Sequence, residues 1–321
     1  ELISDVDSVK TKTDLLSVAT DGSVPARCSI SSATDSTTHV TATREALDRL
    51  NAIVSGGINH HCIMSDSRFT RKDGPYGRTA FGYFSAAIGP HFGGFCGGGW
   101  SSPTAGTNAI TIQQSQQPFN CTFMGGTGTI VENLTSQGPP VVNDDSIPLN
   151  FRRITQTAGN SCRGYTDKDY VFQGASNFFP LLNLCRGPIT SVKFRLLAEG
   201  HVGGITGINW TFPSASNSST VSYPELATAG PHVVEHVKNV AVTACVPGVD
   251  PQQYRATFSG AGDNIDTIAL QWLNNNATKG MTLTSLSAGG ANFGSILSSQ
   301  ANSGPLIQAM GFKVFHIASG A

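Results

Sequence analysis

The segment His232-Val-Val-Glu235-His236 matches the H-x-x-E-H pattern of inverted zinc proteases. That chemistry requires both histidines on one face of a helix, with the glutamate beside a metal-bound water. Pro231 precedes the motif, and valines crowd the stretch around it. β-branched residues at this density favour a strand, on which the zinc-binding face does not form. We therefore expect a valine-rich strand here and no zinc site.

A second group of metal-ligating residue types comprises His60, His61, Cys62, His91 and Cys96. Their spacing fits no zinc site, so we expect buried or loop histidines. The glycine-rich run that contains Cys96 lacks the Lys-Ser or Lys-Thr of a phosphate loop. It is more typical of flexible backbone or close packing.

The remaining candidates for catalysis are carboxylates and a serine. Asp144 and Asp145 are adjacent and would point apart on a strand, so a solvated turn before Ile147 is expected. Ser161 lacks the G-x-S-x-G elbow and its strand-turn-helix setting. The sequence therefore assigns no catalytic, cofactor-binding or metal-ligating residue, and we do not expect an enzyme.

Basic residues form only small groups, namely Arg71-Lys72, Arg152-Arg153, and Lys193 with Arg195. Isolated basic pairs are usually solvated, and no interleaved aromatic residues suggest stacking on single-stranded nucleic acid. No basic arm is present, so contacts with RNA would involve segments outside this chain.

Charge is scarce overall. The chain has 321 residues, of which 13% are charged and 36 are glycine, and its net charge is −1. A globular chain usually carries about a quarter charged residues. This composition excludes a coiled coil, a disordered chain and a strongly basic nucleic-acid binder. It favours an all-β, loop-rich protein with a neutral polar surface, and no apolar run is long enough to span a membrane.

Cysteines and glycosylation motifs are scattered along the chain. The seven cysteines form no Cys-x-x-Cys pair, and their spacing favours buried free thiols: Cys28, Cys62, Cys96, Cys121, Cys162, Cys185 and Cys245. Five Asn-x-Ser/Thr motifs would suit a secreted glycoprotein, although a chain rich in these residues generates them by chance: Asn120, Asn133, Asn209, Asn217 and Asn276.

The chain divides into an expected extended arm over 1–42 and a single domain over 43–321. The arm is polar and would need a partner surface to order it. A helix is expected from Thr43 to Val54, where apolar residues fall at helical spacing before Gly56 and Gly57.

Strand signals dominate after residue 165. Val192, Phe194 and Leu196 alternate with polar residues. Three further sets recur at every second position: Tyr254, Ala256 and Phe258; Ile268, Leu270 and Trp272; and Phe315 and Ile317, which alternate with Val314 and His316 in a final strand. Short strands, glycine and proline turns and few short helices indicate an all-β fold, an eight-stranded jelly-roll β sandwich.

Two segments carry a resemblance to a known family. They are Pro148-Leu-Asn-Phe-Arg-Arg-Ile-Thr155 and Cys185-Arg-Gly-Pro-Ile-Thr-Ser-Val-Lys-Phe-Arg-Leu196, with Phe178-Phe-Pro-Leu181 between them. Together they resemble capsid proteins of the picorna-like virus order, Picornavirales, over residues 148–197. Cys185 and Pro188 depart from the family's usual residues, and the Gly-Glu that leads the first motif is absent.

The resemblance implies a jelly roll that tiles an icosahedral shell, an arm that crosses to neighbours, and release from a polyprotein, which would account for a chain that begins at Glu1. We therefore expect a structural capsid protein that assembles in the host cytoplasm with copies of itself or sister proteins around an RNA genome. The alternative is a secreted or cell-surface β-rich glycoprotein, lectin-like or filament-forming. A secreted hydrolase with an unrecognised carboxylate pair is a third hypothesis.

Overall fold

The computed structural model divides the chain into two compact units, Glu1–Gly57 and Ile58–Ala321. The structure describes residues 56–65, 89–101, 103–105, 121–124, 130–132, 144–149, 151–166, 189–212, 216–240, 252–286 and 302–318. All of the helices and strands that it describes lie in the second unit. The arm over 1–42 and the helix from Thr43 to Val54 lie outside the described residues, so the boundary at 42/43 stays a prediction.

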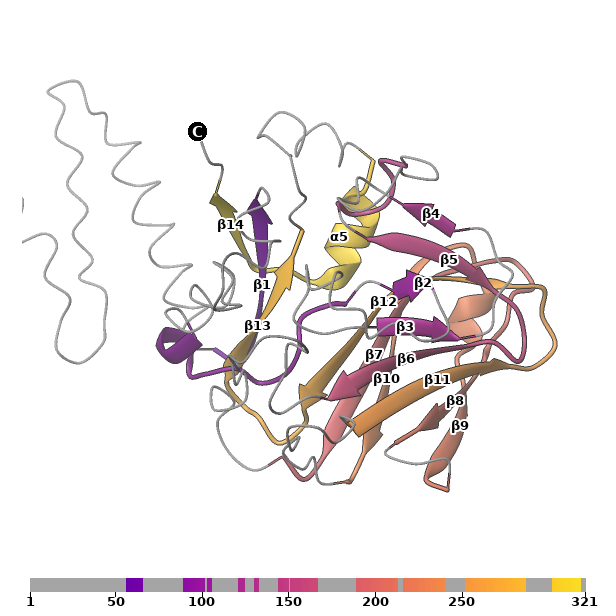
Figure 1. Cartoon of the computed structure of the whole chain (residues 1–321), viewed down its shortest axis with the longest axis horizontal. Coiled ribbons are helices and arrows are strands. Elements are labelled where there is room, and N and C mark those ends of the chain that lie inside the picture. The colour runs from indigo at the N-terminus through magenta and orange to yellow at the C-terminus, as the bar shows by residue number, and fades with distance from the viewer. Residues whose placement is uncertain are drawn as a thin grey trace, which may run out of the picture. The chain divides into compact units, whose positions relative to one another are not determined.

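Two sheets form the body of the second unit (Figure 1). The first sheet has the order β10 (Gly230–Lys238), β7 (Val192–Gly200), β12 (Ile265–Asn274), β5 (Arg152–Gln156) and β4 (Ile130–Glu132). The second has the order β2 (Pro103–Ala105), β3 (Cys121–Met124), β6 (Ser161–Thr166), β11 (Gln252–Ser259), β8 (Gly207–Thr211) and β9 (Ser218–Ser222).

The eight strands from β5 to β12 pair as one long hairpin wound into two sheets. β5 pairs with β12, β6 with β11, β7 with β10 and β8 with β9, all antiparallel. Antiparallel pairs β7·β12 and β8·β11 then join these hairpin pairs within each sheet. This is the topology of a jelly roll. The expected all-β, eight-stranded jelly-roll sandwich is therefore confirmed.

The core between the two sheets follows from the alternation that the sequence predicts. On β7, Phe194 and Leu196 are fully buried between the sheets, while Lys193 and Arg195 point the other way. The ring of Phe194 lies 4.5 Å from the ring of Tyr254 on β11, centroid to centroid. Tyr254, Ala256 and Phe258 of β11 are buried in the same core, as expected.

Strand β12 departs from the expected alternation. Thr267 and Ala269 face the consecutive residues Ala198 and Leu197 of β7, so Ile268 is an extra residue in a β-bulge. The bulge reverses which side chains face inward. Leu270 and Trp272 lie in the core between the sheets, but Ile268 lies in a second core outside them. The prediction that these three residues share one face was wrong.

A third layer covers the outer side of the first sheet. It contains the parallel sheet β13 (Gly280–Ser285), β1 (Ile58–Ser65), β14 (Val314–Ala318) and the helix α5 (Gly304–Met310). The second core joins this layer to the sandwich, with Trp100 donating its indole N–H to the Met310 carbonyl at 3.0 Å. Two 3-10 helices, η1 (Gly89–Phe92) and η3 (Pro224–Ala227), complete the helices of the described part.

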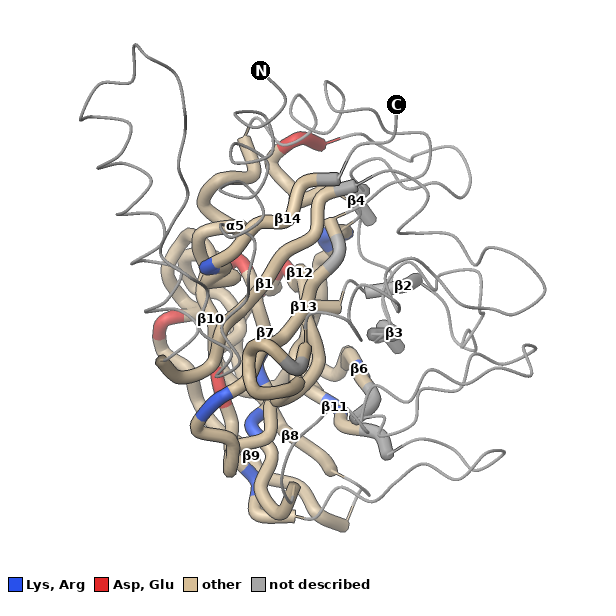
Figure 2. The backbone as a smooth tube through the Cα atoms, turned by 90° about the vertical axis from the view of Figure 1, so that its left-hand side faces the viewer, with Lys and Arg blue, Asp and Glu red and all other residues tan. Residues whose placement is uncertain are grey.

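The predicted final strand is β14, and it pairs with β1. Phe315 and Ile317, the expected apolar face of this strand, are 45% and 56% exposed. Within the described residues, no helix is long and apolar enough to cross a membrane. Positions occupied by Lys, Arg, Asp or Glu are sparse along the described backbone (Figure 2), in keeping with the composition.

Candidate functional site

Most of the ion pairs that the structure describes lie on one surface, the side of the first sheet that faces away from the sandwich core. Strand alternation directs Lys193, Arg195 and Glu199 of β7 to this side. We call it the outer face. Two clusters of polar side chains lie on it, one around Arg195 and one around Arg153.

The Arg195 cluster is built by strand register. Glu235 of β10 and Gln271 of β12 are the direct cross-strand neighbours of Arg195. The Arg195 Nε lies 2.8 Å from Glu235 Oε1, and its Nη1 donates to Gln271 Oε1 at 2.6 Å. Lys193 Nζ lies 3.1 Å from the other Glu235 oxygen. Burial lowers the pKa of Arg195, and the Glu235 carboxylate opposes that shift.

The same cluster reaches the third layer. The guanidinium of Arg195 lies 4.8 Å from the centre of the Trp100 ring, a cation–π contact. Its Nη1 is 3.5 Å from Nε2 of His60 on β1. Gln271 Nε2 donates to the Gly98 carbonyl at 2.9 Å. These contacts connect the sandwich to the layer that covers it.

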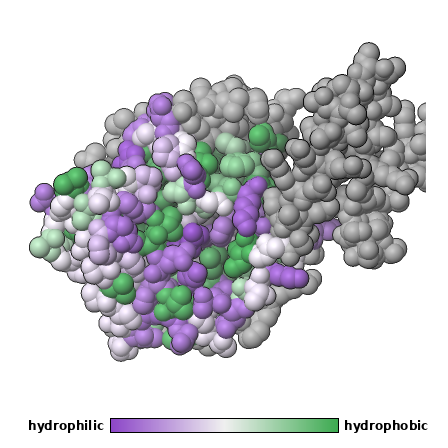
Figure 3. Space-filling model, turned by 180° about the vertical axis from the view of Figure 1, so that it is seen from behind, coloured by the Kyte–Doolittle hydropathy of each residue, from purple (hydrophilic) through white to green (hydrophobic). Residues whose placement is uncertain are grey.

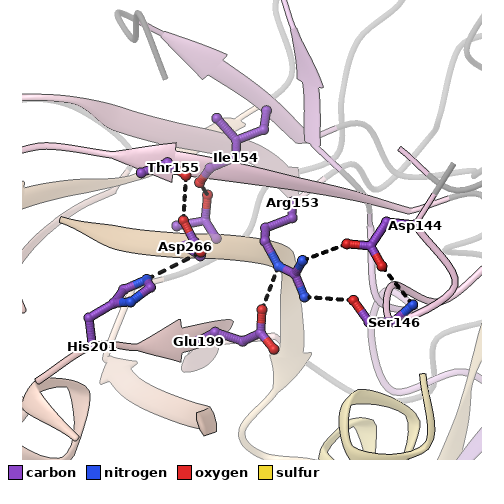
Figure 4. Close-up of polar contacts among 9 residues, drawn as sticks. Asp144, Ser146, Arg153, Ile154, Thr155, Glu199, His201 and Asp266 are labelled. Atoms are coloured by element: carbon purple, nitrogen blue, oxygen red, sulfur yellow. Dashed lines mark hydrogen bonds and ion pairs between the residues drawn. The ribbon is translucent and has the colours of Figure 1, made fainter. Parts of the chain in front are cut away.

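The Arg153 cluster lies where the chain enters β5 (Figure 4). Arg153 Nη1 is 2.9 Å from Asp144 Oδ2, its Nε pairs with Glu199 of β7, and its Nη2 donates to Ser146 Oγ at 3.2 Å. Burial alone would raise the pKa of Asp144, but hydrogen bonds from Ser146 and the charge of Arg153 outweigh it and lower that pKa. The cluster therefore holds an ionised carboxylate against a fixed guanidinium.

A histidine–carboxylate pair adjoins the Arg153 cluster. His201 Nε2 lies 3.2 Å from Asp266 Oδ2, and Thr155 Oγ1 donates to Asp266 Oδ1 at 2.6 Å (Figure 4). Ser146 accepts its hydrogen bond from Arg153, and no described contact joins it to a histidine that would act as its base. Around this site the described residues form an ion-pair network that joins β5 to β7, and they include no nucleophile–base pair.

The residues of the H-x-x-E-H pattern lie on strand β10, as the valine density predicts. Glu235 points to the outer face, toward Arg195. His236 points to the opposite side and stacks on Trp210, with ring centroids 6.0 Å apart. His232 contacts Thr228 through Nε2. Histidines and glutamate therefore lie on opposite faces of a strand, which is incompatible with the zinc arrangement.

The second group of metal-ligating types is also dispersed. His60 and His61 point to opposite faces of β1, where their rings contact Thr282 and His316 respectively. The Cys96 thiol donates to the Met281 carbonyl at 3.4 Å, and His91 is exposed. Among the described residues, no three His, Cys, Asp or Glu side chains are grouped to hold a metal ion.

The glycine-rich run is close-packed, one of the two explanations expected. A Cβ on Gly97 would lie 2.4 Å from the Trp272 carbonyl oxygen, and one on Gly99 would lie 2.0 Å from the Leu283 carbonyl oxygen. These glycines let the run pass directly against β12 and β13.

Asp144 and Asp145 open a turn, as expected, since the Ile147 N–H donates to the Asp144 carbonyl at 3.2 Å. Asp145 accepts a hydrogen bond from Asn302, and Ser161 is buried at the start of β6. Asp144 and Asp145 therefore have structural partners, Arg153 and Asn302 respectively.

The interpretation of the basic pairs as solvated was wrong for the residues at the centre of each cluster. The side chains of Arg153 and Arg195 are only 17% and 12% exposed, and both are ion-paired. Alternation along β7 indicates that Arg195 points outward, but its partners come from β10 and β12. Their register is set by the fold, so no local signal identifies them. Arg71 and Lys72 lie outside the described residues.

Among the cysteines whose side chains are described, Cys62, Cys96 and Cys162 are buried free thiols as expected. Burial raises the pKa of Cys62, and it raises that of Cys96 to about 12. Three motif asparagines are also described. Asn276 is exposed and Asn209 and Asn217 are half-buried.

Comparison with known proteins leaves the family open. No family model matches the chain, and no curated protein matches it. Among solved structures, a peptidoglycan O-acetylesterase matches 85% of this chain and 59% of its own with a TM-score of 0.47 and 15% identity. TmCBM61 in complex with β-1,4-galactotriose matches 49% of this chain and 89% of its own with a TM-score of 0.26 and 11% identity.

An exo-β-1,3-galactanase from Phanerochaete chrysosporium matches 46% of this chain and 26% of its own, with a TM-score of 0.24 and 10% identity. The chain thus spans 59% of the esterase and 26% of the galactanase, less than two thirds of each. Likenesses this weak carry no argument about activity or ligand.

Proposed function

We propose that this chain is a structural, non-enzymatic capsid protein of an RNA virus, which assembles with copies of itself or with sister proteins into an icosahedral shell. The proposal rests on the coincidence of two features: the jelly-roll topology of β5 to β12, and the sequence resemblance of residues 148–197 to picorna-like capsid proteins. The virion would be its location, with assembly in the host cytoplasm.

The position of the resembling segments supports the proposal. The first segment forms the turn before β5 and most of that strand, and the second leads into β7. Both strands are neighbours of β12 in the first sheet. The Arg153–Glu199 ion pair connects the first segment to β7, the strand in which the second segment ends. The motifs therefore serve one structural unit, the outer face of the jelly roll.

The surface also suits a protein that is covered by neighbours. Four large apolar residues are exposed in the described part: Val202, Val237, Phe315 and Ile317. Polar and apolar residues are intermixed on the face seen from behind (Figure 3), without one dominant apolar patch. Interfaces have a composition close to that of the general surface and are depleted in charge at their core.

The alternative, a secreted or cell-surface β-rich glycoprotein, is favoured by one observation, the exposed motif asparagine Asn276. A lectin-like role gains no support from the tryptophans. All three tryptophans of the chain, Trp100, Trp210 and Trp272, are at most 1% exposed, so none is free to stack on a sugar ring.

The decisive experiment is electron microscopy of material purified from the natural source of the chain, combined with peptide mass spectrometry. We expect closed isometric particles that contain this chain, with Asn209, Asn217 and Asn276 unmodified. Soluble single molecules or filaments with glycans on these asparagines would refute the capsid proposal and support the alternative.

A further inference from the structure

Three histidines lie together in the third layer, around its central strand β1. His60 points toward the sandwich, where its Nδ1 is 2.8 Å from Thr282 Oγ1 and its Nε2 is 3.5 Å from Arg195 Nη1. His61 points to the other face of β1. Its Nδ1 lies 2.9 Å from Nε2 of His316 on β14, and the two rings stack with centroids 5.2 Å apart.

Each contact requires an unprotonated acceptor nitrogen. Arginine has only donors, so Nε2 of His60 must be the acceptor and carry no proton. Between His61 and His316, one nitrogen donates the hydrogen that the other accepts. If both of these nitrogens were protonated, two N–H groups would face each other at 2.9 Å. Protonation of His60 Nε2 therefore breaks its contact with Arg195, and protonation of both facing nitrogens breaks the contact between His61 and His316.

The charges around these histidines add to the effect. Arg195 and Lys313 face His60, and His316 and His60 face His61. Glu235, which contacts the Arg195 that faces His60, is already paired with Arg195 and Lys193. The described residues of η1, β1, β13 and β14 include no Asp or Glu. A proton added here has no counter-charge on these elements.

Burial is the main reason that the pKa of His60 and that of His61 are each lowered to about 3, and it also lowers the pKa of His316. The ordinary value is 6.5. A folded-state pKa below the unfolded one stabilises the fold above pH 6.5 and loses that contribution as the pH falls toward 3. The loss is already substantial at pH 5.

We propose that His60, His61 and His316 form an acid-sensitive latch: His60 holds β1 against Arg195 of the sandwich, the His61–His316 pair holds β1 to β14, and the sheet β13-β1-β14 opens more readily as the pH falls from 7 to 5. The sandwich β5 to β12 stays folded during this opening. The latch does not depend on the proposed capsid function and can be tested on the full chain alone.

Hydrogen exchange measured by mass spectrometry at pH 7 and pH 5, with exchange times scaled for the intrinsic pH dependence, tests the latch. If His60 and His61 each gain a proton on opening, the opening constant of β1, β13 and β14 rises about 25-fold per histidine, or about 600-fold for both. Peptides from β7, β11 and β12 should keep their protection. An equal change in both sets of peptides, or none in β1, would overturn the proposal.

Matched variants assign the effect. His61→Asn combined with His316→Gln keeps an amide hydrogen bond but removes both titrating rings. In this double variant the opening constant should rise only about 25-fold between pH 7 and pH 5, which is the contribution of His60. His91→Asn, at an exposed histidine of η1, should keep the full response. If peptides of the sandwich have lost their hydrogen-exchange protection in the double variant at pH 7, His60→Gln alone provides the same test. Its opening constant should also rise by only about 25-fold. A wild-type response in the double variant or in His60→Gln contradicts the latch.

Discussion

Replacing Arg153 by methionine tests whether the outer face is held by its ion pairs. Met keeps much of the apolar stem but removes the guanidinium, which leaves Asp144 and Glu199, 27% and 23% exposed, without their common partner. Breaking a fully buried pair costs about 3–5 kcal/mol, and partial exposure reduces this. We expect a loss of about 2–3 kcal/mol in the free energy of unfolding.

Lys193→Met is the matched control. Lys193 is 31% exposed, and its partner Glu235 is 40% exposed and retains Arg195. Exposed pairs contribute about 0–1 kcal/mol, so this variant should be nearly as stable as the wild type. Urea denaturation followed by circular dichroism measures both.

The reasoning is refuted if Arg153→Met loses less than about 1 kcal/mol, the ceiling for an exposed pair, or no more than Lys193→Met. A pH series adds a second check. Because the pKa of Asp144 is lowered from its ordinary 3.8, its share of the wild-type advantage is complete above that value and disappears as the pH falls further.

Three further predictions concern packing and titration. Gly164→Ala should destabilise the chain by about 1–3 kcal/mol in urea denaturation, since the new Cβ would lie 2.4 Å from the buried Tyr254 ring. Cys62 and Cys96 should resist alkylation by iodoacetamide at pH 8 until the chain unfolds, because burial raises the pKa of both thiols. Peptide mass spectrometry measures the labelling, and labelling of the folded chain would contradict their burial. His236→Phe should raise the melting temperature relative to wild type below pH 6.5, because the lowered pKa of His236 destabilises the native chain in that range. A difference in melting temperature between variant and wild type that stays constant across pH would count against this.

The local sequence pattern was sufficient to predict the jelly roll but not the ion pairs on its outer face. Alternation on β7 and β11 identifies the core because every second side chain of a strand shares a face. The same rule fails at Ile268, where one inserted residue reverses the facing of β12 and nothing in the local sequence marks the bulge. Tertiary register decides the outcome there.

The partners of Arg153 and Arg195 could not be predicted from the sequence for a similar reason. Glu199 lies 46 residues from Arg153 along the chain, and Gln271 lies 76 residues from Arg195. Each pair meets only after strands from distant parts of the sequence have aligned. A basic pair read by itself therefore resembles a solvated one, although the fold buries it.

The parallel sheet has a consequence for the order of events during synthesis. Its central strand β1 is made early, but its partners β13 and β14 begin at Gly280 and Val314. The contact between His61 and His316 spans 255 residues of chain. Strands β5 to β12, which pair among themselves, can fold while the ribosome is still extending the chain, because domains fold as units during translation. Strand β1 must wait, because its neighbours reach it only after β13 and then β14 have emerged.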